Sequence, residues 1–237
     1  MLEKDLKSSY EKVLNLFLLK KIIDKDDIKS SIQLFENQSI LDSNPIPKKL
    51  EVVGIVSGIP FDVSFQKKII NIQSILSKNL GSTLHYIVKP NNLAVEYAIL
   101  KWPTDDFPHE TIKRTKDYLK NTKFKKFVFT IVGVQIHQDG CIVLQGISEE
   151  MTIHKIRRGI IENIPNFPKK QSKWSHVPLG RFLEPLDITK KKLLNELIFS
   201  LNNNFSSFNT EINSLHLIKE HRWYMEEVSK IYTKELI

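Results

Sequence analysis

Cysteine is almost absent from the chain, and this absence excludes several kinds of protein. Cys141 is the only cysteine in 237 residues, so the chain can form neither an internal disulfide nor a metal site built from cysteines. No apolar run approaches the roughly 18 residues of a membrane-spanning helix. The first residues, MLEKDLKSSYEK, carry charges where a secretory signal would be apolar. We therefore expect a soluble protein of the reducing cytoplasm that does not enter a membrane.

Glycine is also scarce, with 8 residues, and no glycine-rich phosphate loop of the GxGxxG or GxxxxGK type is present. This argues against an enzyme that uses a dinucleotide or a nucleoside triphosphate, and we expect no cofactor. No two of the 7 histidines are four residues apart in the way that helical metal ligands are, so we expect no metal.

Arginine is the rare basic residue in a chain with a net charge of +8 and a pI near 9.3. Only 5 of the 35 basic residues are arginine, the side chain whose planar fork binds phosphate through two hydrogen bonds. The charge is compatible with a nucleotide or nucleic-acid partner. It is equally compatible with a lysine-rich surface that only contacts solvent.

The first 45 residues differ from the rest of the chain. Apolar residues at three- and four-residue spacing predict two helices in the first forty residues, and Pro45 and Pro47 predict a linker at 42–48. We divide the chain into an N-terminal helical extension, 1–45, and a main domain, 46–237. The extension is a candidate docking site for a protein partner.

The main domain alternates strand and helix patterns. Strands are predicted at 50–58, 83–89, 93–100, 127–137, 141–146, 174–182, 212–219 and 228–236, and helices at 64–80, 108–121, 149–164 and 189–204. Ser64 is the expected N-cap of the first of these helices. The turn 90–92 is expected to join two strands as a hairpin. Two successive strand–helix–strand–strand blocks predict an α+β fold of two similarly built lobes.

His176 has the most informative surroundings of the histidines. Residues 176, 178 and 180 of a strand share one face and Val177 and Leu179 the other, so the imidazole faces either a cleft or solvent. The loop before it contains Lys169, Lys170 and Lys173 and leads into Trp174. Lysines beside an indole are typical of single-stranded nucleic-acid binding. The alternative is a solvated charge run above a packed indole, and Trp223-Tyr224-Met225 is expected to pack the second lobe.

Three stretches occur in a characteristic order: a strand at 50–61 before a helix, VKPNNL (88–93) before a strand, and SHVPLGR (175–181). This succession, over about residues 50–220, resembles the 2H phosphoesterase superfamily of RNA 2',3'-cyclic phosphodiesterases and bacterial 2'-5' RNA ligases. The resemblance implies two pseudo-symmetric lobes with antiparallel sheets around a central cleft and helices outside. It also implies that each lobe supplies one His-x-Thr/Ser motif to the cleft.

Both motifs depart from that pattern. Ala94 and Glu96 stand where the first histidine and threonine are expected, and Pro178 replaces the hydroxyl residue that should follow His176. In the family, one imidazole takes a proton from water and the other gives one to the leaving oxygen, each worth about 10²–10⁴-fold. Ala94 transfers no proton, ionised Glu96 repels phosphate, and Pro178 has neither hydroxyl nor N–H. The family mechanism cannot run on these residues.

Three functions stay open. The first is the capture of a nucleotide or RNA phosphate end with little or no hydrolysis, helped by Arg181, Glu96 and the basic loop. The second is a cyclic phosphodiesterase in which His176 is the general acid and His85 or His137 a relocated base. In the predicted hairpin, His85 would lie beside Glu96, either as an oriented base or only as a pair that stabilises the sheet. His137 lies at the cleft rim or caps a turn. The third is an interaction protein whose N-terminal helices dock a partner.

Overall fold

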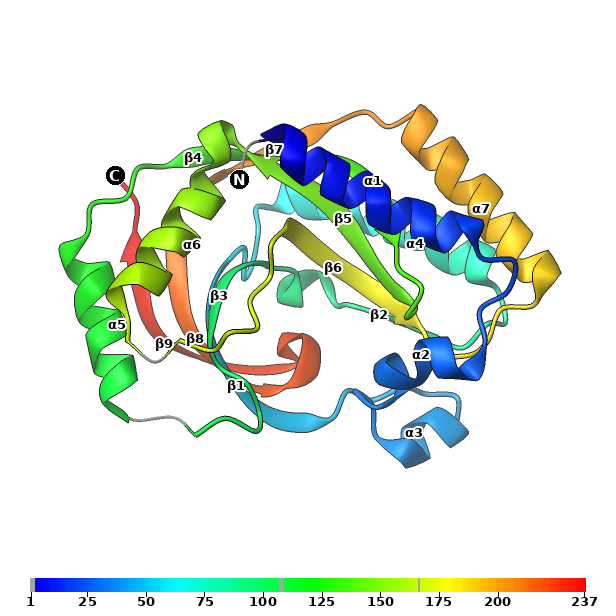
Figure 1. Cartoon of the computed structure of the whole chain (residues 1–237), viewed down its shortest axis with the longest axis horizontal. Coiled ribbons are helices and arrows are strands. Elements are labelled where there is room, and N and C mark those ends of the chain that lie inside the picture. Colours follow the sequence, from blue (N-terminus) through cyan, green and yellow to red (C-terminus); the bar gives the residue numbers. More distant parts are fainter. Residues whose placement is uncertain (1–2, 107–108, 166) are drawn as a thin grey trace.

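The computed structural model describes residues 3–106, 109–165 and 167–237 and contains two antiparallel sheets with helices on their outer sides (Figure 1). The helices are α1 (Glu3–Leu19), α2 (Lys25–Ile32), α3 (Asn37–Leu41), α4 (Val63–Leu80), α5 (His109–Asn121), α6 (Thr152–Asn163) and α7 (Ile188–Asn203). The strands are β1 (Lys49–Ser57), β2 (His85–Ile87), β3 (Val95–Lys101), β4 (Phe127–Ile136), β5 (Cys141–Ser148), β6 (Ser175–Phe182), β7 (Phe208–Ile212), β8 (Ser214–Arg222) and β9 (Glu227–Glu235). Short 3-10 helices lie at η1 (Pro90–Asn92), η2 (Glu149–Met151) and η3 (Trp223–Met225).

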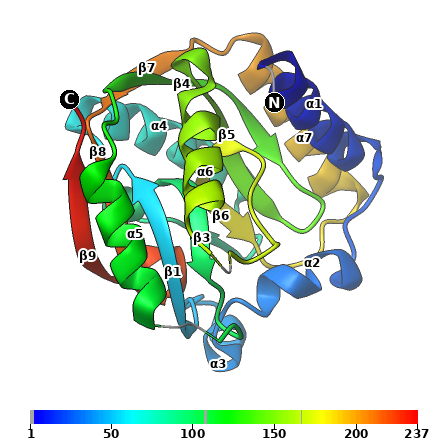
Figure 2. The same ribbon diagram turned by 60° about the vertical axis from the view of Figure 1, so that its left-hand side comes forward.

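The strands confirm the predicted α+β fold with two antiparallel sheets. The first sheet has the order β3-β1-β8-β9 and the second the order β2-β6-β5-β4-β7. Helices α5 and α6 lie side by side over the first sheet (Figure 2), whereas α4 and α7 pack on the second. The expectation of two successive blocks is wrong, because β2 joins the second sheet while β8 and β9 return to the first. Each lobe therefore combines strands from both halves of the chain.

The predicted hairpin at 90–92 is also wrong. Strand β2 pairs with β6, where Tyr86 lies opposite Arg181, and β3 pairs with β1, where Glu96 lies opposite Val56. Between them, η1 carries the chain from one sheet to the other, and Pro90 at its first position has the backbone angle that a helix start requires. Local alternation identified both strands but does not specify which neighbour a strand pairs with.

Several predicted boundaries move. Asp62, and not Ser64, is the N-cap of α4, because its carboxylate accepts a hydrogen bond from the N–H of Phe65 at 2.9 Å. The strand predicted at 212–219 is two strands, β7 and β8, on either side of Asn213. The first residue of the helix predicted at 108–121 lies outside the described residues, and α5 occupies 109–121.

The N-terminal segment packs onto both sheets. The hydroxyl of Tyr10 on α1 donates to the carbonyl of Gly146 at 3.0 Å and accepts from the N–H of Ser175 at 3.1 Å. The stretch predicted as a linker at 42–48 is held in place, since Arg222 bonds the carbonyl of Pro47. None of the helices within the described ranges has the length and apolar character needed to cross a bilayer.

Candidate functional site

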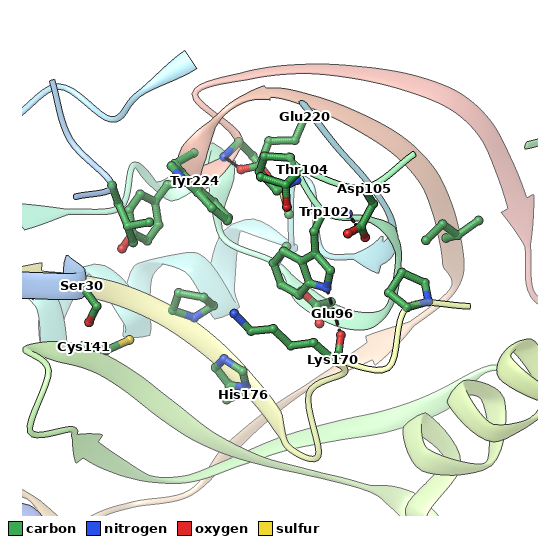
Figure 3. A pocket seen from close by; sticks show the side chains of 18 of the residues that line it. Ser30, Glu96, Trp102, Thr104, Asp105, Cys141, Lys170, His176, Glu220 and Tyr224 are labelled. Atoms are coloured by element: carbon green, nitrogen blue, oxygen red, sulfur yellow. Dashed lines mark hydrogen bonds between the residues drawn. The ribbon is translucent and has the colours of Figure 1, made fainter. Parts of the chain in front are cut away.

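A cleft of about 900 Å³ lies between the two sheets (Figure 3). Ala94, directly before β3, and Glu96 on β3 line it from the first sheet, and His176, Pro178 and Arg181 on β6 line it from the second. The structure therefore brings all four motif positions to one cleft. Other residues that line it include Asn92, Trp102, Lys169, Lys170, Glu220, Trp223 and Tyr224.

A β-bulge in β6 turns Arg181 toward the cleft. The pairing with β5 shifts by one residue between Gly180 and Pro178, so strict alternation ends there. The sequence predicted residue 180 on the same face as His176, but Arg181 lies on that side instead. Gly180 has another role, because a Cβ atom there would lie only 2.2 Å from the carbonyl oxygen of Tyr86 on β2. The missing side chain allows β2 to approach.

His176 is an uncharged imidazole at neutral pH. Burial, and to a smaller extent the nearby His137, Arg157 and Arg181, together lower its pKa to about 3. Its Nδ1 atom is buried and has no hydrogen-bond partner among the residues that the structure describes. A neutral His176 is a poor fit to the general-acid role that the hydrolase hypothesis gives it.

The position expected to hold the other imidazole carries only a methyl group. Ala94 is 4% exposed and packs with Val56, Ile59 and Ile218 at the edge of the cleft. Within the described ranges, His176 is the one histidine that lines the cleft.

Two carboxyl groups at the cleft titrate near neutral pH. Burial raises the pKa of Glu96 to about 7, and the charge of Arg157 opposes this shift only in part. Burial likewise raises the pKa of Glu220 to about 7, although its carboxylate accepts a hydrogen bond from the N–H of Met225 at 2.8 Å. Ionised Glu96 raises the pKa of Glu220 further. Both acids are therefore partly protonated, and hence partly neutral, at physiological pH.

The basic loop divides into a part that reaches the cleft and a part that does not. The Lys170 ammonium lies 5.0 Å from the centre of the Trp102 ring, and in Figure 3 its side chain runs between Trp102 and His176. The side chain of Gln171 fixes this loop, because it accepts from the N–H of Ile99 at 2.9 Å and donates to the carbonyl of Ile99 at 2.8 Å. The loop is thereby attached to the free edge of β3.

Lys173 and Trp174 do not line the cleft, contrary to the sequence-based prediction. The Trp174 indole donates to Ser9 on α1 at 2.5 Å, and its ring centre lies 5.7 Å from that of Tyr10. The sequence had left open the alternative that the indole of Trp174 is packed under the loop. In the structure this indole is packed beneath α1. Lys173 is exposed outside the cleft.

Neither proposed relocated base lines the cleft. The ring of His85 bonds Ser77 on α4 at 2.8 Å and the carbonyl of Thr83 at 2.6 Å. The expected pairing with Glu96 is wrong, because the two residues belong to different sheets. His137 contacts the amide of Gln135 at 2.9 Å, and burial lowers its pKa to about 4.

The lining residues that were not predicted from the sequence include Trp102, Glu220, Trp223 and Tyr224. The last two were expected to pack the second lobe, but they lie at the tip of the β8–β9 hairpin of the first sheet and reach into the cleft. Tyr224 has a positive φ of 60° there, and its hydroxyl bonds the guanidinium of Arg181. The only local sequence feature that could have indicated this position is the pair of adjacent aromatic residues, which is as typical of a hydrophobic core as of a binding cleft.

Arg157 on α6 joins the two sides of the cleft. Its guanidinium is buried and donates to three carbonyls, those of Tyr97 at 2.6 Å, Glu96 at 3.0 Å and Trp174 at 2.8 Å. Because Glu96 lies on β3 and Trp174 directly precedes β6, this side chain sets the spacing between the sheets. Among the described residues, no group of three or more His, Cys, Asp or Glu side chains is placed to hold a metal ion.

Comparison with protein-family models and with curated protein sequences finds no match. Solved structures do match. LigT from Escherichia coli complexed with 3'-AMP gives a TM-score of 0.55 at 12% identity, over 79% of this chain and 99% of LigT. TT0787 from Thermus thermophilus gives 0.54 at 9% identity, over 78% and 97%. A structure described as a phosphoesterase gives 0.54 at 10% identity, over 78% and 98%.

The chain has the 2H phosphoesterase fold. At these identities the likeness is one of fold, as the resemblance implied. Within this 2H phosphoesterase fold, the chain's own residues decide what the cleft can do. They place one neutral imidazole, the carboxyl groups of Glu96 and Glu220, three aspartates, lysines and indoles there.

Proposed function

We propose that the cleft captures a nucleotide or an RNA phosphate end and does not hydrolyse it. One observation carries this proposal: His176 shares the cleft with Ala94, which has only a methyl group where a two-histidine mechanism needs a second imidazole. The lowered pKa of His176 also favours the neutral imidazole over the imidazolium form that a general acid needs at neutral pH. Hydrolysis of a cyclic phosphate needs a proton taken from water and a proton given to the leaving oxygen. The described residues of the cleft do not offer the pair of imidazoles that a two-histidine mechanism uses for these two steps.

Binding groups for a nucleotide are present. Lys169, Lys170 and Arg181 supply positive charge, and the Trp102 and Trp223 rings, with centres 6.5 Å apart, supply stacking surface. Structures with the same fold hold such ligands: the LigT structures are described as complexes with ATP, phosphate and 3'-AMP. The buried, free Cys141 fits the reducing cytoplasm in which we place this binding.

The N-terminal segment contributes to the same cleft. Ser30 and Leu34 line one part of it, and Ser31 bonds the guanidinium of Arg181. We therefore propose that residues 1–45 complete the cleft of the main domain, 46–237. This role replaces that of a free docking arm for a partner.

Binding and hydrolysis are measured separately. Titration calorimetry with 3'-AMP, 2',3'-cyclic AMP and short RNAs ending in a 3'-phosphate tests binding, and the affinity is expected to fall as salt rises because phosphate contacts release counterions. Chromatography of the 2',3'-cyclic nucleotides after incubation tests hydrolysis, which is expected to be absent. Lys169→Ala/Lys170→Ala is expected to weaken binding, with the exposed Lys192→Ala on α7 as its matched control.

The second candidate, a cyclic phosphodiesterase that uses His176, predicts the opposite pattern. Turnover by the natural chain that disappears in His176→Ala would support this candidate and overturn capture without hydrolysis. If no ligand of the panel binds at low salt, both candidates are wrong.

A further inference from the structure

Polar groups without partners lie in the cleft on both sides of Ala94. Asn92 and Glu96 are each two residues from Ala94, and all three line the cleft. The side-chain nitrogen of Asn92, Nδ2, is buried and has no hydrogen-bond partner within the described ranges. The Glu96 carboxyl likewise has no hydrogen bond or ion pair to any residue that the structure describes, although its pKa is raised by burial. A buried amide nitrogen such as that of Asn92 normally has a partner, so a ligand is the natural source of one. The Glu96 oxygens are not among the fully buried atoms, and they can bind the same ligand from the cleft.

The chemistry of these groups defines what such a ligand must offer. A carboxylate accepts hydrogen bonds through two oxygens, whereas the amide nitrogen of Asn92 donates. In its ionised form Glu96 therefore needs two adjacent donors from the ligand, and Asn92 needs an acceptor. Lysines and indoles line the same cleft, so the ligand should also carry a negatively charged group and a flat ring.

Guanine is the common nucleobase that fits this description. Its N1–H and N2 amino group are adjacent donors, and its O6 acceptor lies next to them. Adenine and cytosine each place a ring acceptor beside their amino group, and uracil places its N–H between two acceptors. A ring acceptor or carbonyl oxygen would face the Glu96 oxygens in all three, which is unfavourable when the carboxyl is ionised.

We infer that the cleft selects guanine nucleotides, with Glu96 accepting from N1–H and the N2 amino group and Asn92 donating to O6. This inference rests on the proposed nucleotide binding and specifies which base the cleft recognises. The base would occupy the first sheet's side of the cleft, near Trp102 and Trp223. The phosphate would then meet Lys169 and Lys170.

The charged groups around Glu96 predict a second measurable effect of binding, the release of a proton. Arg157 from α6 and Glu220 from β8 act on its charge, and Lys170 and His176 line the same cleft from the loop and from β6. Two donors from a bound base stabilise the ionised carboxyl and lower its pKa. Guanine binding at pH 7 is therefore coupled to proton release, which calorimetry in buffers of different ionisation enthalpy detects.

The test compares four nucleoside 3'-monophosphates, those of guanosine, inosine, adenosine and uridine, by titration calorimetry on the full chain. Inosine lacks only the N2 amino group, so the guanosine ligand is expected to bind about tenfold to a hundredfold more tightly, the value of one hydrogen bond to a charged group. In Glu96→Gln this preference and the proton release are expected to disappear, while inosine binding stays. Exposed Glu11→Gln on α1 is the matched control and keeps both.

Asn92→Ala provides an independent variant, and it is expected to weaken guanosine and inosine binding equally because both bases carry O6. Equal binding of all four nucleotides overturns the base assignment and leaves the proposed function standing. A guanine preference that survives in Glu96→Gln overturns the role of Glu96. If none of the four nucleotides binds, the proposed function itself fails.

Discussion

Ala94 and His176 line one cleft from opposite sheets, and only His176 has a side chain that can exchange a proton. At these two positions the cleft therefore has a single imidazole. Burial then makes even the remaining imidazole neutral. Two other titratable groups of this cleft, Glu96 and Glu220, change charge near pH 7, where binding by the natural chain would take place.

Restoring the motif residues should produce hydrolysis. We expect Ala94→His combined with Glu96→Thr and Pro178→Thr to hydrolyse 2',3'-cyclic nucleotides at a rate measurable by chromatography, about 10²-fold or more above the same chain with Ala94 kept. The added imidazole supplies the missing proton transfer, and the loss of Glu96 removes a negative charge from the phosphate position. Adding His176→Ala to the triple variant should abolish the activity. Equal hydrolysis by the natural chain and the triple variant would contradict this prediction.

Glu220 should make the stability depend on pH. Its pKa is about 7 in the folded chain and 4.5 without the fold, so the folded state holds the extra proton between these values. The free energy of unfolding therefore falls as pH rises from 4.5 to 7 and stays low above 7. Glu220→Gln is expected to raise it by about 1–3 kcal/mol at pH 8 but little at pH 4.5. Urea unfolding at both pH values checks this, with Glu11→Gln as the control that changes neither value.

The docking of α1 should depend on one hydroxyl. Tyr10→Phe removes a donor to Gly146 and an acceptor for the N–H of Ser175, which leaves two buried backbone groups unpaired. We expect the free energy of unfolding to fall by about 1–3 kcal/mol, measured by chemical denaturation. Tyr232→Phe, which changes a half-buried tyrosine on β9, is the matched control. Equal stability of the two variants would show that the Tyr10 hydroxyl does not stabilise α1 docking.

A buried lysine should destabilise the fold at neutral pH. Lys191 on α7 is 1% exposed, contacts the Phe17 ring at 3.8 Å and bonds Asn195, and burial lowers its pKa from 10.5 to about 8. The destabilisation is full below pH 8 and is relieved as pH rises toward 10.5. Lys191→Met is expected to raise the free energy of unfolding by about 1–3 kcal/mol at pH 7 and less at pH 10. The exposed neighbour Lys192→Met should have little effect at either pH.

Local patterns predicted the elements well and their partners poorly. The strands at 50–58, 127–137 and 174–182 and the helix at 64–80 agree with β1, β4, β6 and α4 to within a few residues. Their apolar spacing is a property of each segment. The prediction of a hairpin at 90–92 was wrong because strand pairing depends on the sheet in which a strand is buried. Strand β2 belongs to the second sheet and β3 to the first.

The candidate site, too, was predicted from the sequence only in part. The motif-like stretches around Ala94 and His176 marked two parts of the chain that the fold brings to one cleft. Trp223 and Tyr224 belong to a hairpin whose tip enters the cleft only because β8 returns to the first sheet. The position of Arg181 depends on a bulge whose register is set by pairing with β5.

What the amino-acid sequence determined by itself is the set of chemical groups: one histidine where a two-histidine mechanism needs two, and Glu96 and Pro178 in place of hydroxyl residues. Only the tertiary structure decided their state. Removal from water makes His176 a neutral imidazole and makes Glu96 a carboxyl group that holds its proton up to about pH 7. The physical reason is that charge is costly away from water, and which groups lose water depends on how the two sheets close around them.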